Sequence, residues 1–237
     1  MKNQYFGDIN DYRKYGLLRC LAEATGLPVG VGWLLTPDDG RSDGEFRRYL
    51  LEPGRWRAHD PELYDRLRKL LGPGTRRSVA YARHWELLPR AMYFEEELTD
   101  SSVGRASYFL RAWQALGSCP LVFFDPDNGF EVPSVRPGNK GSAKYLYWSE
   151  LDEAYHRGHS ILLYQHFRRV RRAPFTEGLA TTLAKRLNAP LVDSFSTAHV
   201  VFFMIARPEH VELFDRAHDL IAARWAGQIN PVSRVAA

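Results

Sequence analysis

An apolar run that ends in a carboxylate-rich turn constrains this chain more than any other stretch. Residues 120–131 read Pro-Leu-Val-Phe-Phe-Asp-Pro-Asp-Asn-Gly-Phe-Glu. Four apolar residues without polar alternation are typical of a strand covered on both faces, as in a parallel sheet between helices. Pro126 cannot extend the ladder of hydrogen bonds, and Asn128 with the glycine after it favours a tight turn. Because ligands of open α/β sheets bind beyond the carboxyl ends of the strands, we expect Asp125, Asp127 and Asn128 to lie at a site.

A second stretch repeats this design. Residues 160–166 are an apolar run that ends in Tyr164, Gln165 and His166, and an arginine-rich segment follows at 168–172. Two buried strands that end in polar clusters predict two walls of one site, with His166 as a further candidate catalytic group. A long basic loop at 132–144 is a candidate binding loop. The candidate contacts to substrate or phosphate are Tyr12, Lys144, Tyr164, Gln165, Arg168 and Arg169.

The N-terminal third predicts a helix, a strand and a helical insertion. Cap-forming Asp8 and Asn10 precede apolar residues at helical spacing, and Lys14 lies where the helix start would border a ligand crevice. A strand is expected at 29–35. The segment that follows, about 45–90, reads as a helical insertion. Its first part, residues 46–57, interleaves arginines and aromatics, which suits either nucleic-acid contacts or a solvated loop.

The C-terminal third sets the topology. Residues 190–208 are two strand-like runs whose short break permits a hairpin and forbids a parallel crossover. We therefore expect one α/β domain over 1–237: a Rossmann-like three-layer sandwich with a mostly parallel sheet, closed by a C-terminal antiparallel hairpin, with the helical insertion after the first strand. The tail at 230–237 is expected to be flexible.

Composition limits the class of protein. The 237 residues are 45% hydrophobic, enough for a sizeable core in one domain. The net charge of +4 permits a nucleic-acid partner without requiring one. Cys20 and Cys119 lie far apart, and no apolar run approaches the roughly 18 residues of a membrane span. We expect a cytoplasmic protein without a membrane partner.

The segments 11–15, 125–126 and 196–208 carry a resemblance to a known family. In the order of its elements, the chain resembles the class I S-adenosylmethionine-dependent methyltransferase fold, nearest the ribosomal-RNA adenine N6-methyltransferase group and the three-Cys-motif partner proteins. Asp125 and Pro126 match the first half of that group's Asp-Pro-Pro-Tyr motif, and Asp127 and Asn128 occupy the second half. The aromatic face of that motif would have to come from Phe130 or Tyr164.

This resemblance implies a methyltransferase-like enzyme that acts on nucleic acid, with reaction chemistry at residues 125–128. It implies S-adenosylmethionine at the end of the first strand, where a doubly wound fold binds nucleotide-like ligands. The positions that would hold the cofactor are Lys14, Trp33, Thr36, Asp38, Asp39 and Glu95.

Two other hypotheses stay open. Asp125, Asp127 and Glu131 are hard oxygen ligands near one strand end, so a Mg²⁺-dependent nuclease or phosphoesterase is the first alternative. A non-catalytic nucleic-acid-binding module is the second. The histidines lack the spacing of a zinc motif, so we predict no zinc site.

Overall fold

The computed structural model describes residues 1–40, 44–72 and 74–236. The described helices and strands follow in chain order: η1 (Asn3–Tyr5), α1 (Ile9–Thr25), β1 (Val29–Gly32), η2 (Arg48–Leu51), α2 (Pro53–Trp56), α3 (Pro61–Leu70), α4 (Tyr81–His84), β2 (Ala91–Phe94), α5 (Ser102–Leu116), β3 (Leu121–Phe124), β4 (Gly129–Phe130), η3 (Ser142–Lys144), β5 (Tyr145–Leu146), α6 (Trp148–His156), β6 (Ser160–His166), α7 (Arg172–Leu187), β7 (Leu191–Ser196), β8 (Val200–Ala206), η4 (Pro208–His210), α8 (Val211–Arg224) and β9 (Asn230–Ala236). The prediction of an α/β fold is confirmed.

A capping side chain and a glycine set the two ends of helix α1, which borders the candidate site. The Asp8 carboxylate accepts hydrogen bonds from the backbone N–H groups of Asn10 and Asp11, which otherwise have no partner at the start of α1. Gly26 ends the helix with φ +70°, a left-handed conformation that glycine adopts without strain. The first turns of α1 therefore have a defined position against the sheet.

Seven strands form the main sheet, in the order β2-β1-β3-β6-β8-β7-β9. The pairings β2·β1, β1·β3 and β3·β6 are parallel. Beyond them, β8 lies antiparallel between β6 and β7, so the predicted hairpin is present. The tail predicted to be flexible instead pairs with β7 as edge strand β9, where Val235 pairs with Val192 in the register, while residue 237 lies outside the described residues.

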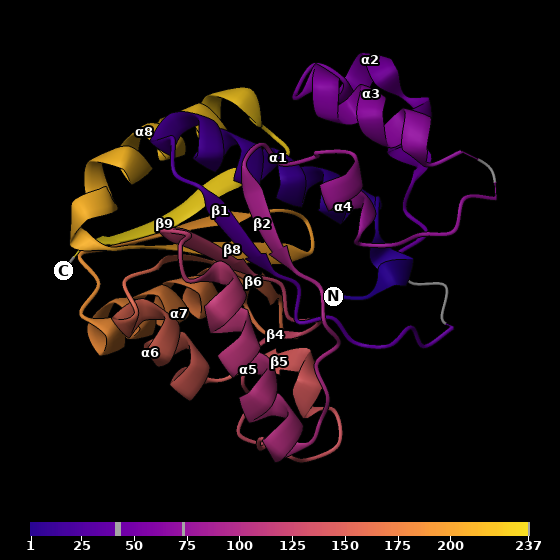
Figure 1. Cartoon of the computed structure of the whole chain (residues 1–237). Helices are drawn as coiled ribbons and strands as arrows, with labels where there is room; N and C mark the ends of the chain where they lie inside the picture. The colour runs from indigo at the N-terminus through magenta and orange to yellow at the C-terminus, as the bar shows by residue number, and fades with distance from the viewer. Residues whose placement is uncertain (41–43, 73, 237) are drawn as a thin grey trace.

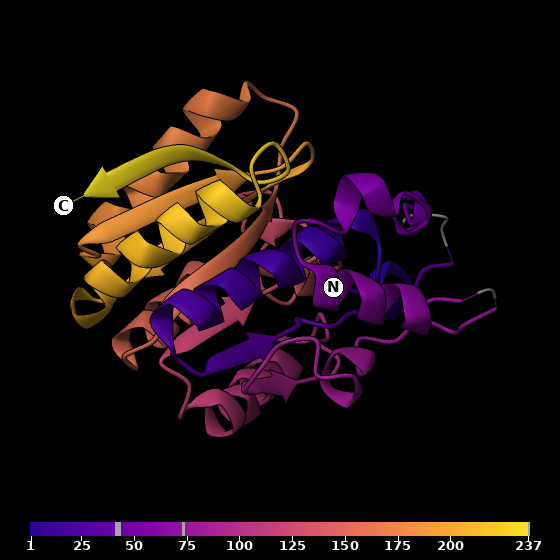
Figure 2. The same cartoon turned by 90° about the horizontal axis from the view of Figure 1, so that it is seen from above.

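Helices cover both faces of the sheet, as Figures 1 and 2 show. Side chains alternate along β3: Leu121 and Phe123 pack with α1, α8 and the insertion helix α3, whereas Val122 and Phe124 pack with α5, α6 and α7. Figure 2 shows α1 and α8 side by side over the first face. The insertion between β1 and β2 holds η2 and α2 to α4, as predicted, and extends beyond α1.

Candidate functional site

A cavity of about 1100 Å³ opens beyond the carboxyl ends of β3 and β6 and beside the first turns of α1; we call it the main cavity. The chain passes from β1 outward to β2 and then back to β3 on the other side of β1, so the strand order reverses between β1 and β3. Such a reversal leaves a crevice between the connections that run to opposite faces, which is where open α/β sheets bind ligands. The sequence-based prediction that the two polar strand ends share one hollow agrees with this geometry.

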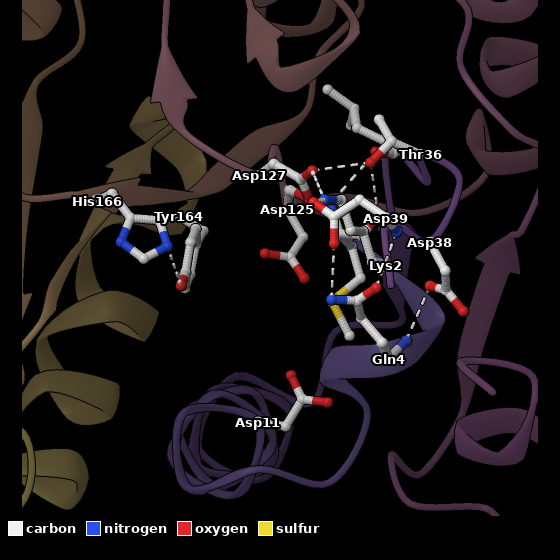
Figure 3. A network of polar contacts seen from close by, with 12 residues as sticks. Lys2, Gln4, Asp11, Thr36, Asp38, Asp39, Asp125, Asp127, Tyr164 and His166 are labelled. Atoms are coloured by element: carbon white, nitrogen blue, oxygen red, sulfur yellow. Dashed lines mark hydrogen bonds and ion pairs between the residues drawn. The ribbon is translucent and has the colours of Figure 1, made fainter. Parts of the chain in front are cut away.

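A buried lysine joins α1 to the turn after β3. Lys14 Nζ lies 2.6 Å from Asp11 Oδ1 and 2.6 Å from Asp125 Oδ2, and all three side chains are almost fully buried. Burial by itself lowers the pKa of Lys14, but the two carboxylates outweigh it, and the pKa is raised above its ordinary value. Lys14 therefore stays charged and fixes the Asp125 turn against α1. Figure 3 shows the carboxylates of Asp11 and Asp125 facing each other across the site.

A tyrosine–histidine pair forms the β6 wall. The Tyr164 hydroxyl lies 3.0 Å from His166 Nε2, and Lys14 Nζ lies 5.2 Å from the centre of the Tyr164 ring. Burial raises the pKa of Tyr164 well above its usual value. Shielding by the cavity walls lowers the pKa of His166, although its side chain stays accessible from the cavity and nearby Asp125 opposes the shift. Both groups are therefore neutral near pH 7, and they share a hydrogen bond whose direction depends on the tautomer of His166.

The N-terminal residues close the other side of the turn. The ammonium group of Met1 lies 2.6 Å from Asp127 Oδ1 and donates to the backbone oxygen of Asp125 at 2.8 Å. The Thr36 hydroxyl donates to Asp127 Oδ2 at 2.8 Å. Burial alone would raise the pKa of Asp127, but the ammonium and the hydroxyl outweigh it and lower the pKa. Lys2, beside these groups in Figure 3, pairs with Asp39.

Exposed arginines follow β6 along the rim of the main cavity. Arg168 donates to the backbone oxygen of Glu131 at 2.9 Å, and Arg172 lies over the Phe167 ring. The side chains of Arg169 and Arg171 have no hydrogen bond, ion pair or ring contact with any residue in the described parts of the chain. These two guanidinium groups are free to bind an anion.

A smaller hollow of about 360 Å³ adjoins the main cavity near the ends of β1 and β2; we call it the side hollow. Thr36 and Asp100 line it, and Lys2, Asp39 and Lys144 line both spaces. The two spaces therefore share a boundary that carries two lysines and one aspartate, close to the Thr36–Asp127 hydrogen bond.

Most of the predicted site residues meet at these two spaces. Asn128, exposed on the turn after β3, faces the main cavity. Thr36 reaches the side hollow, and residues 41–43, which follow the predicted cofactor contacts Asp38 and Asp39, lie outside the described residues. The predicted residues that line either space are Lys14, Thr36, Asp39, Asp125, Asp127, Asn128, Lys144, Tyr164, His166, Arg168 and Arg169.

Three predicted aromatic contacts belong to the core instead. Tyr12 is fully buried, and its hydroxyl donates to the backbone oxygen of Trp56 at 2.8 Å. Trp33 is also fully buried, among the rings of Tyr15, Tyr93 and Phe123. Phe130 packs edge-on against Trp148, with ring centres 4.4 Å apart. Of the two aromatic candidates near the motif, only Tyr164 therefore lines the main cavity.

Three predicted polar contacts also lie outside both spaces. Gln165 is buried on the opposite face of β6, where its Oε1 accepts from the backbone N–H of Phe130 at 2.7 Å. Glu95 pairs with Arg83 at 3.1 Å. Asp38 accepts from the backbone N–H of Gln4 at 3.0 Å. These side chains hold parts of the fold in place.

The carboxylates of the metal hypothesis have different partners. Asp125 pairs with Lys14, Asp127 with Met1, and Glu131 accepts from the backbone N–H of Trp148 at 2.8 Å. Within residues 1–40, 44–72 and 74–236, no group of three or more His, Cys, Asp or Glu side chains is placed to hold a metal ion. The structure thus does not bring the three proposed Mg²⁺ ligands together.

Asp11 and Phe46 line the main cavity but were not among the predicted site residues. The signal for Asp11 was its spacing: it precedes Lys14 by three residues, which places both on one side of a helix. Phe46 begins the basic and aromatic segment at 46–57 that suits nucleic-acid contacts, but nothing in the sequence shows that this part of the insertion folds toward the cavity.

Comparisons with known proteins leave the family open. No family model, no curated protein and no solved structure matches the chain. No helix in the described part of the chain combines the length and apolarity needed to cross a membrane.

Proposed function

We propose that this protein is a methyltransferase-like enzyme that acts on nucleic acid, with the reaction at the turn of residues 125–128. The observation that carries the proposal is the meeting of two ligand-sized spaces at this turn: the main cavity of about 1100 Å³ and the side hollow of about 360 Å³. Group transfer needs a donor and an acceptor in contact, and adjoining spaces at a strand-order reversal suit that requirement.

The chemistry of the side hollow fits S-adenosylmethionine in part. This cofactor carries an ammonium, a carboxylate and a sulfonium, so it needs neighbours of both signs. Lys2, Asp39 and Lys144 supply both signs where the two spaces meet, and Thr36 adds a hydroxyl. When bound, S-adenosylmethionine supplies a methyl group. The proposed contacts of the cofactor are therefore Thr36, Asp39 and Lys144, without Trp33, Asp38 and Glu95.

The hydrogen-bond acceptors of the turn differ in whether other residues already bind them. Asp125 Oδ2 is held by Lys14, and the backbone oxygen of Asp125 accepts from the Met1 ammonium. Asn128 is exposed to the main cavity, and no other described residue holds its side-chain amide. We therefore assign the orientation of the substrate amine to Asn128, with Asp125 and Lys14 as positioning residues that keep the turn in place.

The side chains around the main cavity suit a nucleic-acid substrate. Arg169 and Arg171 leave their guanidinium donors open at the rim, and guanidinium groups bind phosphate oxygens well. The same cavity is lined by buried Tyr164 and by the exposed, neutral imidazole of His166, a flat ring that a base can contact. A ligand that carries both phosphates and a base matches these groups.

Cofactor binding and transfer test this proposal together. S-adenosylmethionine should raise the melting temperature, since a ligand that binds only the folded state stabilises it. Labelled methyl groups should then appear in RNA or DNA, and Asn128→Ala should slow the transfer about a hundredfold. Glu95→Gln is the control, because Glu95 lies outside both spaces. Absence of both a thermal shift and label in either polymer would refute the proposal.

A further inference from the structure

One exposed aromatic ring stands at the main cavity. Phe46 is 68% exposed and is the one aromatic side chain among the strongly exposed large hydrophobic residues of the described chain. It lines the main cavity, whereas Leu51, which is similarly exposed, does not. A single exposed apolar side chain is common on protein surfaces, so the case for a bound partner depends on the groups that share the cavity with this ring.

The backbone around Phe46 is held firmly. Its carbonyl accepts from the backbone N–H of Ile9 at 3.0 Å, at the start of α1. Gly44, with φ +88°, packs so closely that an added Cβ would lie 2.6 Å from the backbone oxygen of Gln4. Arg77 donates to the backbone oxygen of Gly44 at 2.7 Å. The ring is thus presented from an anchored segment, which keeps the entropy cost of using it for binding low.

Two arginines of the rim have side chains without partners among the described residues. Arg169 and Arg171 flank Val170, which is 56% exposed, and all three line the same cavity as Phe46. They come from the segment after β6, far from Phe46 in sequence. The rim therefore combines one ring face with two open guanidinium groups, the combination by which proteins hold single-stranded nucleic acid.

We propose that the main cavity takes single-stranded nucleic acid, with Phe46 stacked on a base and Arg169 and Arg171 on the adjacent phosphates. In a duplex both faces of a base are covered by its neighbours, so a protein ring can stack on it only where the strand is unpaired. The inference rests on the proposed function for its nucleic-acid substrate and names the form of that substrate. It needs no methyl donor.

Direct binding of oligonucleotides tests this inference. Fluorescence anisotropy would follow fluorescein-labelled 12-nucleotide RNA and DNA single strands of mixed sequence, and the same sequences as duplexes, on the full chain without S-adenosylmethionine. The single strand should bind more tightly than its duplex. Phe46→Ala should weaken binding of the single strand roughly tenfold to a hundredfold, because stacking on one base is lost. Phe46→Trp should retain binding, since it keeps a ring.

Leu51→Ala is the matched control, because it removes an exposed apolar side chain outside the cavity. Equal affinities of the parent and Phe46→Ala, or tighter binding of the duplex, would overturn the inference, as would no binding of either RNA or DNA. Binding that depends on Phe46 without any response to S-adenosylmethionine would uphold the inference and count against methyl transfer. A response to S-adenosylmethionine together with binding that does not depend on Phe46 would overturn this inference and leave the proposed methyl transfer standing.

Discussion

Lys14 Nζ and Asp125 Oδ2 lie 2.6 Å apart, although 111 residues separate them in the chain. Both side chains are nearly inaccessible to solvent, and Asp11 completes the group from the same helix as Lys14. An ion pair in such a place is costly to break, because the remaining charges stay buried without compensation. The position of the turn after β3 therefore depends on a residue of α1.

Lys14→Met should lower the free energy of unfolding by about 3–5 kcal/mol, because it leaves the carboxylates of Asp11 and Asp125 buried and facing each other. Asp125→Asn should cost less, since Lys14 keeps Asp11 as a partner. Urea unfolding measures both. Lys185→Met, on the exposed face of α7, is the control and should change stability by less than about 0.5 kcal/mol. Equal losses for Lys14→Met and Lys185→Met would show that the buried pair is unimportant for stability.

A pH dependence should arise at the start of α1. Burial, and then the charge of Asp11, raise the pKa of Asp8 to about 7, above the roughly 3.9 of an unfolded chain. The folded state therefore binds this proton more tightly, so the contribution of Asp8 to stability is full below about pH 4 and is lost as the pH rises through about 7. Asp8→Asn keeps a good N-cap and removes this loss.

Melting temperatures of the parent and Asp8→Asn at about pH 5 and about pH 8 measure this effect. The melting temperature of Asp8→Asn should increase relative to that of the parent as the pH rises. Asn10→Asp leaves Asp8 in place and serves as the comparison, because it adds a carboxylate to the same turn. A difference between parent and Asp8→Asn that stays constant with pH, or shrinks as the pH rises, would contradict the raised pKa.

The strand ends were predictable because they depend on local patterns and one topological rule. Leu121–Phe124 lacks polar alternation, which predicts the strand, and Pro126, two residues after it, predicts where the strand ends. The short break between β7 and β8 left a hairpin as the only connection. Neither prediction required knowledge of what packs against the strand. The N-terminal partners of Asp127 could not be predicted in this way, since Met1 and Thr36 reach it only through the folded chain.

Periodicity explains two of the misplaced contacts. Residues two apart on a helix lie about 200° apart, so Tyr12 and Lys14 could not both face the cavity, and Tyr12 is in the core. Successive residues of a strand point to opposite faces, so Gln165 faces away from Tyr164 and His166. For Trp33 and Glu95 the sequence held no comparable signal, because both follow the last paired residues of their strands.

Arg169→Ala combined with Arg171→Ala should weaken binding of a single-stranded oligonucleotide. It should also lower the slope of log K against log salt concentration by about 1.4, because each phosphate contact to a single strand contributes about 0.7. Anisotropy titrations at several salt concentrations measure both quantities. Lys185→Ala with Arg186→Ala removes the same charge at the other end of α7 and should leave the slope unchanged. An unchanged slope in the Arg169 and Arg171 variant would place the phosphate contacts elsewhere.

Gln165→Ala should reduce stability while binding changes little, because this side chain supports the turn and does not line the cavity. Its loss leaves the buried backbone N–H of Phe130 without its acceptor, which costs about 1–3 kcal/mol. Gly129→Ala should be at least as harmful, since φ is +102° and an added Cβ would lie 2.5 Å from the Gln165 amide. Urea unfolding and oligonucleotide titration of the same variants separate the two roles, with exposed Gln114→Ala as the control. Lost affinity at unchanged stability in Gln165→Ala would instead make Gln165 a substrate contact.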